Sequence, residues 1–144
     1  MPNVAIVYFS GYGHTQKQAE AVQAGAQAVA GCTAELVKID ADGNLTDAHW
    51  QTLEAADGII FGSPTYMGGA PWQFKKFADA SSKPWYSRHW QNKLAAGFTN
   101  SASMNGDKGS TLMYFVTLAS QHGMLWVSLG MLPSNSKSAV RNDV

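Results

Sequence analysis

The feature that most constrains the fold is an apolar run that ends in a short polar loop and leads at once into a helical pattern. The run is Val4–Phe9, the loop is Ser10-Gly-Tyr-Gly-His-Thr15, and apolar residues then recur at helical spacing to about Ala30. A strand that delivers such a loop to a helix N-terminus brings unpaired backbone N–H groups and the positive end of the helix dipole together. The pattern therefore predicts an anion site, and phosphate in particular.

Small and hydroxyl-bearing residues in this loop fit that prediction. Ser10 and Thr15 add hydroxyl donors, while Gly11 and Gly13 let the backbone close around a ligand. The structural alternative is that both hydroxyls serve only as turn and N-cap groups.

Further strand and helix patterns alternate along the rest of the chain. Strands are predicted at Ala34–Ile39, Gly58–Phe61, Leu94–Phe98 and Leu125–Leu129, and helices after Thr46, after Pro71 and from near Ser110. Such alternation predicts an α/β fold, with a doubly wound parallel sheet of five strands and helices on both faces. A fifth helix normally completes this fold, and the pattern ends before one. We therefore expect a single domain over residues 1–144, truncated at its C-terminus, with the final helix missing.

Composition narrows the class of protein. The 144 residues suffice for one domain with a core, and the formal net charge of zero argues against nucleic acid or an anionic membrane as the main partner. Cys32 is the single cysteine, which excludes an intrachain disulfide and fits a reducing cytoplasm. No signal peptide and no run long enough to span a membrane is evident. The four histidines and the cysteine show no metal-binding spacing, so no metal is predicted.

Three loops with unusual chemistry follow the first, third and fourth predicted strands. They are Ser10–Thr15, Gly62–Gly69 and Thr99–Gly109. With the strand order 2-1-3-4-5, these strands are neighbours around the point where the order reverses, so all three loops can reach one ligand.

Two other nucleotide-binding motifs fit the first loop less well. A Walker A loop is excluded because there is no Gly-Lys-Ser/Thr. Gly11-x-Gly13 and the later Asp40 partly match a dinucleotide site, but Gln16 stands where the third glycine is needed. A terminal monophosphate suits the loop better.

With these loops in place, the sequence resembles a known family. The first loop is similar to the FMN-phosphate loop of the flavodoxin-like superfamily, and Gly62-Ser-Pro-Thr-Tyr-Met-Gly68 is similar to the isoalloxazine loop of its quinone-reductase branch. Asn100–Gly106 resembles the third flavin loop of that branch, and Gln121-His-Gly-Met124 resembles the end of its fourth helix. In this order and spacing, the chain resembles the NAD(P)H:quinone oxidoreductases of the tryptophan-repressor-binding-protein type.

The resemblance implies a flavodoxin-like fold and an FMN-dependent enzyme that passes two electrons from NADH or NADPH to quinones. It implies that the FMN phosphate is held by Ser10, Gly11, Tyr12, Gly13, His14 and Thr15, that the ring is lined by Pro64, Thr65, Tyr66, Met67 and Gly68, and that the ribityl chain and pyrimidine edge meet Asn100, Ser101, Ala102, Ser103, Met104 and Asn105. Tyr12 and Trp85 would border the nicotinamide and the substrate, and His122 would reach a flavin, often one held by a neighbouring subunit. A homo-oligomer, dimer or tetramer, is implied as well.

The chain departs from the family in its third loop, which is Ser-Ala-Ser-Met-Asn-Gly where the family is commonly glycine-rich, and in lacking the family's C-terminal region. The alternative function is a flavodoxin-like electron carrier without its own substrate.

Structural roles also stay open for single residues. His122 could complement the C-terminal dipole of its helix. Trp85 and Trp90 could be packing or interface residues, although their polar surroundings favour a pocket wall.

Overall fold

The computed structural model describes residues 1–104 and 106–130, so the predictions for Asn105, for the tail from residue 131 and for a missing final helix lie outside the described residues. The strands are β1 (Asn3–Tyr8), β2 (Thr33–Lys38), β3 (Gly58–Pro64), β4 (Leu94–Asn100) and β5 (Leu125–Trp126). The helices are α1 (His14–Gln27), α2 (Asp47–Ala55), α3 (Trp72–Ala80), α4 (Ser82–Tyr86) and α5 (Lys108–Gln121).

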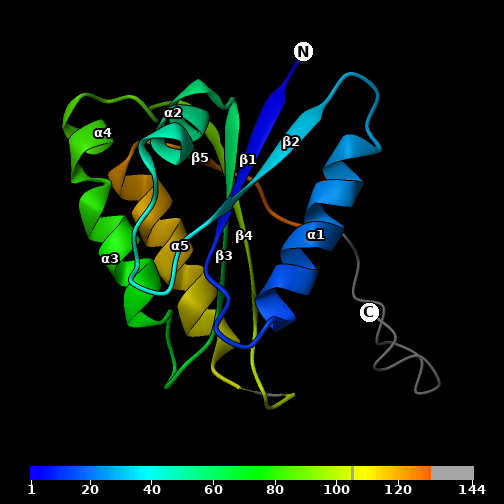
Figure 1. Ribbon diagram of the computed structural model, residues 1–144, viewed down its shortest axis with the longest axis vertical. Coiled ribbons are helices and arrows are strands. Elements are labelled where there is room, and N and C mark those ends of the chain that lie inside the picture. Colours follow the sequence, from blue (N-terminus) through cyan, green and yellow to red (C-terminus); the bar gives the residue numbers. More distant parts are fainter. Residues whose placement is uncertain (105, 131–144) are drawn as a thin grey trace.

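The strands form one parallel sheet in the order β2-β1-β3-β4-β5, which confirms the predicted fold (Figure 1). β1 lies between β2 and β3, where Ile6 pairs in register with Leu36 on one side and Ile60 on the other. β3 and β4 continue to Pro64 and Asn100, beyond the predicted ends. The carboxyl ends of β1, β3 and β4 therefore meet at one edge, the lower edge in Figure 1.

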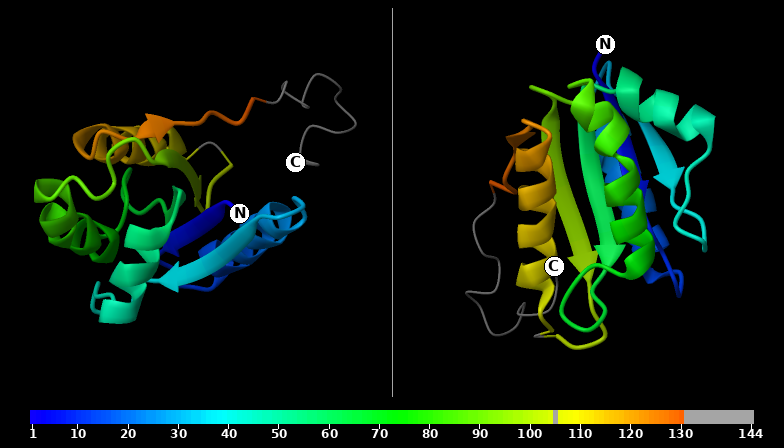
Figure 2. Two further views of the ribbon diagram at one scale, coloured as in Figure 1. Left: turned by 90° about the horizontal axis from the view of Figure 1, so that it is seen from above. Right: turned by 90° about the vertical axis from the view of Figure 1, so that its left-hand side faces the viewer.

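Helices cover the two faces of the sheet unequally (Figure 2). Within residues 1–104 and 106–130, α1 is the helix that packs on one face, where Ala19 lies against Ile6 and Tyr8. α2, α3 and α5 pack on the other face over an aromatic cluster made by Phe61, Phe74, Phe77, Trp90 and Phe115. The ring centroids of Phe74 and Phe115 are 4.9 Å apart. Each such ring contributes about 2–3 kcal/mol of burial free energy, so this second face forms the main core.

Local signals in the sequence account for several helix ends. Thr46 caps α2, because its hydroxyl accepts from the backbone N–H of His49 at 3.2 Å. Pro71 precedes α3 as its N-cap. Gly123, with a φ of +70°, follows α5 as predicted. Other boundaries also differ from the prediction: α1 ends at Gln27, α5 begins at Lys108, β1 and β2 each begin and end one residue earlier, and only two residues of β5 pair with β4.

The sequence analysis missed α4. The segment Ser81–Gln91 contains Pro84 and interrupts the alternating pattern, but a proline is tolerated in the first turn of a helix. Here α4 follows α3 directly, through Ser81.

Part of the sheet face next to α1 carries exposed apolar side chains. Leu94 and Leu125 are register partners, and they are 51% and 56% exposed. Among the described residues, no helix is long and apolar enough to cross a membrane.

Candidate functional site

The loop between β1 and α1 presents a group of backbone donors without protein acceptors. The N–H groups of Gly11, Tyr12, His14 and Thr15 donate to no other described residue. Ser10 organises the loop from within, because its hydroxyl accepts from the N–H of Gly13 at 3.2 Å and of Gln16 at 3.1 Å. Free N–H groups at a helix N-terminus attract an anion. The loop is therefore a fit for a phosphate group.

Two glycines give this loop its shape. Gly13 has a φ of +92°, in the left-handed region that favours glycine, and a Cβ placed there would meet no protein atom within 4 Å. Gly11 is needed for another reason, since a Cβ there would come within 2.5 Å of the hydroxyl oxygen of Tyr66. The first loop thus passes close beneath the second, and Tyr12 and Tyr66 form an edge-to-face pair with ring centroids 6.1 Å apart.

The second loop turns sharply at its tip. Tyr66 and Gly69 exchange two backbone hydrogen bonds, of 2.8 and 3.2 Å, around Met67 and Gly68. Both central residues have positive φ, +50° and +83°, as in a type I′ turn. A non-glycine residue in this region stores strain of about 1 kcal/mol or more. The Met67 side chain is fully exposed at the tip.

Hydrogen bonds join the second and third loops. The N–H of Thr65 donates to the carbonyl of Asn100 at 2.7 Å. The Thr65 hydroxyl shares hydrogen bonds with the hydroxyls of Thr99 at 2.8 Å and of Thr111, on α5, at 2.9 Å. These contacts hold the ends of β3 and β4 against the start of α5.

Lys108 organises the third loop, and sequence reasoning missed it. Its ammonium group donates to Ser101 Oγ at 2.7 Å and to the carbonyls of Ser103 and Met104 at 3.0 and 2.9 Å. A lysine in the first turn of a helix is disfavoured by the helix dipole. That unfavourable position was the one signal in the sequence that pointed to a compensating contact of the Lys108 ammonium group.

The three loops enclose a cavity of about 390 Å³. Its lining consists of residues predicted from the sequence: Tyr12, His14, Thr15, Pro64, Thr65, Tyr66, Asn100, Ser101 and Ala102. Ser10, Gly11 and Gly13 shape the loop beneath it, while Met67, Gly68, Ser103 and Met104 lie on the adjoining turns. Asn105 is outside the described residues. Asp40, the acid that a dinucleotide site would use, instead accepts from the N–H groups of Asp42 and Asn44 in its own turn.

His122 and Trp85 lie at the opposite end of the sheet. α5 starts beside the third loop and runs back, and Leu125, three residues after His122, pairs with Leu94 at the start of β4. His122 therefore does not reach the three loops of its own chain. It borders two shallow hollows that Trp85 also lines, between α4 and α5.

The protonation of His122 follows from its neighbours. The Ser81 hydroxyl donates to the carbonyl of Ala78 at 2.6 Å, so its oxygen accepts from His122 Nε2 at 2.9 Å. The other ring nitrogen, Nδ1, is buried without a partner among the described residues. Burial lowers the pKa of His122 from 6.5 to about 4, so the ring is neutral at pH 7 and does not complement the helix dipole as a cation.

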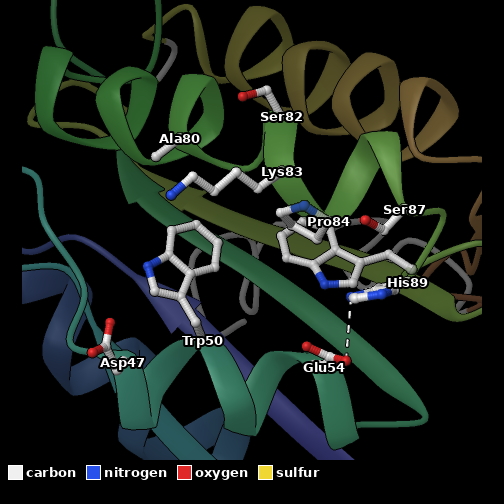
Figure 3. Close-up of a pocket in the computed structure, with 10 residues that line it drawn as sticks. Asp47, Trp50, Glu54, Ala80, Ser82, Lys83, Pro84, Ser87 and His89 are labelled. Atoms are coloured by element: carbon white, nitrogen blue, oxygen red, sulfur yellow. Dashed lines mark ion pairs between the residues drawn. The ribbon is translucent and has the colours of Figure 1, made fainter.

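A larger hollow, of about 480 Å³, lies between α2 and α4 (Figure 3). Trp50 rises from α2 toward Lys83, and Glu54 pairs with His89 Nδ1 at 3.2 Å across the gap. Trp90 is 1% exposed and packs in the aromatic core, which is the packing role left open by the sequence, and it also lines this hollow rather than the cavity between the three loops. In open parallel sheets, ligands bind at the carboxyl ends of the strands, which favours the cavity between the loops.

Comparisons with known proteins agree with this geometry. Residues 4–137 match the family of NADPH-dependent FMN reductases. The whole chain is 54% identical to 75% of Flavodoxin FldP from Pseudomonas aeruginosa, and 88% of it is 34% identical to 71% of an NAD(P)H dehydrogenase (quinone) from Geobacter sulfurreducens. A flavodoxin, WrbA-like protein from Agrobacterium tumefaciens has a solved structure that matches with a TM-score of 0.84 and 63% identity, over 90% of this chain and 79% of that one.

Replacing Gly13 by valine is expected to weaken phosphate binding more than it weakens folding. The branched side chain is strained at a φ of +92°, at a cost of roughly 1–3 kcal/mol, and it projects into the space that a phosphate would occupy. Gly31→Val is the matched control, because Gly31 has a φ of +80°, equally open surroundings and a place far from the loop. Both variants should lose similar stability in urea, but only Gly13→Val should lose FMN affinity, by at least about tenfold, in a fluorescence-quenching titration. Equal affinities in the two variants would place the phosphate elsewhere.

His122 is expected to make the folded protein sensitive to acid. Below pH 6.5, His122 becomes protonated in the unfolded chain, whereas in the folded chain it stays neutral until about pH 4. The free energy of unfolding should therefore be at its full value above pH 6.5 and fall between pH 6.5 and 4, by up to about 1.4 kcal/mol per pH unit. Urea unfolding at several pH values measures this slope. His122→Phe keeps a ring against Trp90 and should remove this contribution. A variant with the same slope as the wild type would contradict the assignment.

Proposed function

The chain belongs to the NADPH-dependent FMN reductase family, a flavodoxin-like family of FMN-binding, NAD(P)H-dependent oxidoreductases. From that premise we propose that it is an NAD(P)H:quinone oxidoreductase. FMN would supply the redox chemistry, accepting a hydride from NAD(P)H and passing two electrons on to a quinone. The single observation that carries the proposal is the set of unpaired N–H groups at α1, opening into a cavity lined by the three flavin-loop segments.

In this proposal the chain's own residues bind and orient the cofactor. The N–H groups of the first loop and the Thr15 hydroxyl hold the phosphate. Asn100 and Ser101 lie where the ribityl chain would run, and Pro64, Thr65 and Tyr66 border the ring. No acid–base pair is required of the protein, because hydride transfer needs alignment and an accessible ring face rather than proton transfer from a side chain.

The rim of the cavity is suited to planar reactants. Tyr12 is 83% exposed and Tyr66 is 37% exposed, and their rings meet edge to face above Gly11. Exposed aromatic rings offer stacking surface to a nicotinamide or a quinone. Both reactants need the same ring face, so we expect them to bind in turn, with ping-pong kinetics.

An electron carrier without its own substrate is the second candidate. One observation favours it: the relative with 54% identity carries the name Flavodoxin FldP. The zero net charge argues against it, because carriers that dock on basic partners are usually strongly acidic. The quinone dehydrogenases at 31–34% identity support the enzyme.

Steady-state kinetics tests the choice between these functions. FMN-loaded protein should oxidise NADH or NADPH with benzoquinone as the acceptor, and initial rates at several quinone concentrations should give parallel double-reciprocal lines. A reductive titration should proceed directly to the two-electron-reduced flavin. Absence of turnover with either nicotinamide, together with accumulation of a one-electron-reduced spectrum, would overturn the enzyme and favour the carrier. The Gly31→Val variant serves as the folded control.

We also propose that His122 serves the flavin site of a neighbouring subunit in a homo-oligomer. Its ring lines two hollows that are also bordered by Trp85, which is 49% exposed, and its buried Nδ1 has no hydrogen-bond partner among the described residues. Neither group can act at the loops of its own chain.

Subunit mixing tests this proposal. His122→Phe should lower kcat/KM for quinone about tenfold, the value of one hydrogen bond of about 1.4 kcal/mol. Gly13→Val subunits should bind FMN more weakly but keep His122, so FMN is supplied at a concentration that loads only the His122→Phe subunits. Hybrids of the two variants, formed by mild unfolding and refolding together, should regain activity. A loss in His122→Phe that no hybrid repairs would show that His122 acts only within its own chain, through the fold.

A further inference from the structure

Gln18, a residue on α1 that no flavin loop contains, is bonded to the third loop. Its Nε2 donates to the carbonyl of Thr99 at 3.2 Å, and its Oε1 accepts from Asn100 Nδ2 at 3.0 Å. The same Asn100 Nδ2 donates to Thr15 Oγ1 at 2.9 Å. The chain Thr99–Gln18–Asn100–Thr15, which we call the amide clamp, thus joins the end of β4 to the first turn of α1.

The carbonyl of Thr99 sets the direction of every hydrogen bond in the amide clamp. A backbone carbonyl can only accept, so Gln18 must turn its Nε2 toward Thr99. The Oε1 of Gln18 then faces Asn100 and can only accept, so Asn100 must donate from its Nδ2. Both hydrogens of that amide are used, one on Gln18 and one on Thr15.

The consequence appears at Thr15. Its side chain is buried, with 1% exposure, and its oxygen already accepts from Asn100. The hydroxyl hydrogen has no acceptor among the described residues. A buried hydroxyl donor left without an acceptor costs free energy of about 1–3 kcal/mol. Thr15 therefore stands as a donor without an acceptor, at the point where four backbone N–H groups are also free.

We propose that Gln18 is a positioning residue that, through Asn100, makes the Thr15 hydroxyl a dedicated donor to the cofactor's phosphate. The proposal rests on FMN binding at the three loops. Without Gln18, the Asn100 amide is free to rotate and present its oxygen to Thr15, whose hydroxyl would then donate to Asn100 instead. The clamp thereby favours a ligand that carries a phosphate over the same ligand without one.

Affinities for FMN and for riboflavin, which lacks the phosphate, test this role. Gln18→Leu should weaken FMN binding about tenfold, as expected for one hydrogen bond to a charged group, and should weaken riboflavin binding by a smaller factor, because riboflavin shares the ribityl contact with Asn100 but lacks the phosphate that Thr15 would meet. Gln23→Leu is the matched control, because Gln23 lies on the same helix and donates to the carbonyl of Ala34, away from the cavity. It should leave both affinities unchanged.

A double-mutant cycle separates positioning from a general loss of structure. In a Thr15→Val background, where the hydroxyl is absent, Gln18→Leu should cause no further loss of FMN affinity. Equal losses for FMN and riboflavin, or additive losses in the cycle, would overturn the proposal. Gln18→Ala is the second variant should the leucine prevent folding.

The wild-type protein separates failure of this inference from failure of the proposed function. If the wild type binds FMN no better than riboflavin, the phosphate is not held at this loop, and both proposals fall. If the wild type prefers FMN and Gln18→Leu keeps that preference, the clamp alone is refuted.

Discussion

The parallel pairing of β1, β3 and β4 is the constraint on which the site depends. Because the three strands run in the same direction and in register, their carboxyl ends meet at one edge of the sheet. The loops that follow these strands are separated by a helix and a strand or more of sequence, yet Thr65 bonds directly to Asn100 and Asn100 to Thr15. A shift of one residue in the β3–β4 register would move Asn100 to the other face of the sheet and break both contacts. The buried aromatic cluster on the second face holds this register in place.

The parts of the structure that local sequence determines were predictable. Runs of apolar residues predicted the buried strands. The glycines and hydroxyl-bearing residues after β1 predicted a loop with free N–H groups. Caps such as Thr46 and turn glycines such as Gly123 act over a few residues, so their patterns suffice. The alternation of elements and the rules of handedness predicted a doubly wound parallel sheet, the order 2-1-3-4-5 was expected for a flavodoxin-like fold, and the sheet has that order.

The parts that depend on tertiary contacts were not predictable. Lys108 looks unfavourable at a helix start until the carbonyls of the third loop are seen around it. Gln18 reads as an ordinary polar residue of an amphipathic helix, and its role appears only once β4 lies beside α1. Trp90 illustrates the reverse error, because a polar sequence neighbourhood concealed a side chain that packs between Phe77 and His122. In each case the partner is distant in sequence, so no window of neighbouring residues contains the signal.

The two ends of the sheet use polar groups in opposite ways. At the carboxyl end, hydrogen-bond donors lack acceptors among the described residues. They are the N–H groups of the first loop and the hydroxyl of Thr15. At the amino end, the group without a partner among the described residues is a hydrogen-bond acceptor, Nδ1 of the neutral His122. An unsatisfied buried group is destabilising, so the buried Thr15 hydroxyl and the buried His122 Nδ1 would each gain free energy from a partner, whereas the N–H groups of Gly11, Tyr12 and His14 belong to exposed residues. At the carboxyl end that partner is an anion, whereas at the amino end it is a donor-bearing group. A single FMN molecule offers both kinds of group, phosphate oxygens and ribityl or ring donors, and one chain cannot bring its two ends to the same cofactor. Under the proposal made for His122, the amino end of one subunit would face the flavin edge of another, and two chains would then serve the two ends of one cofactor.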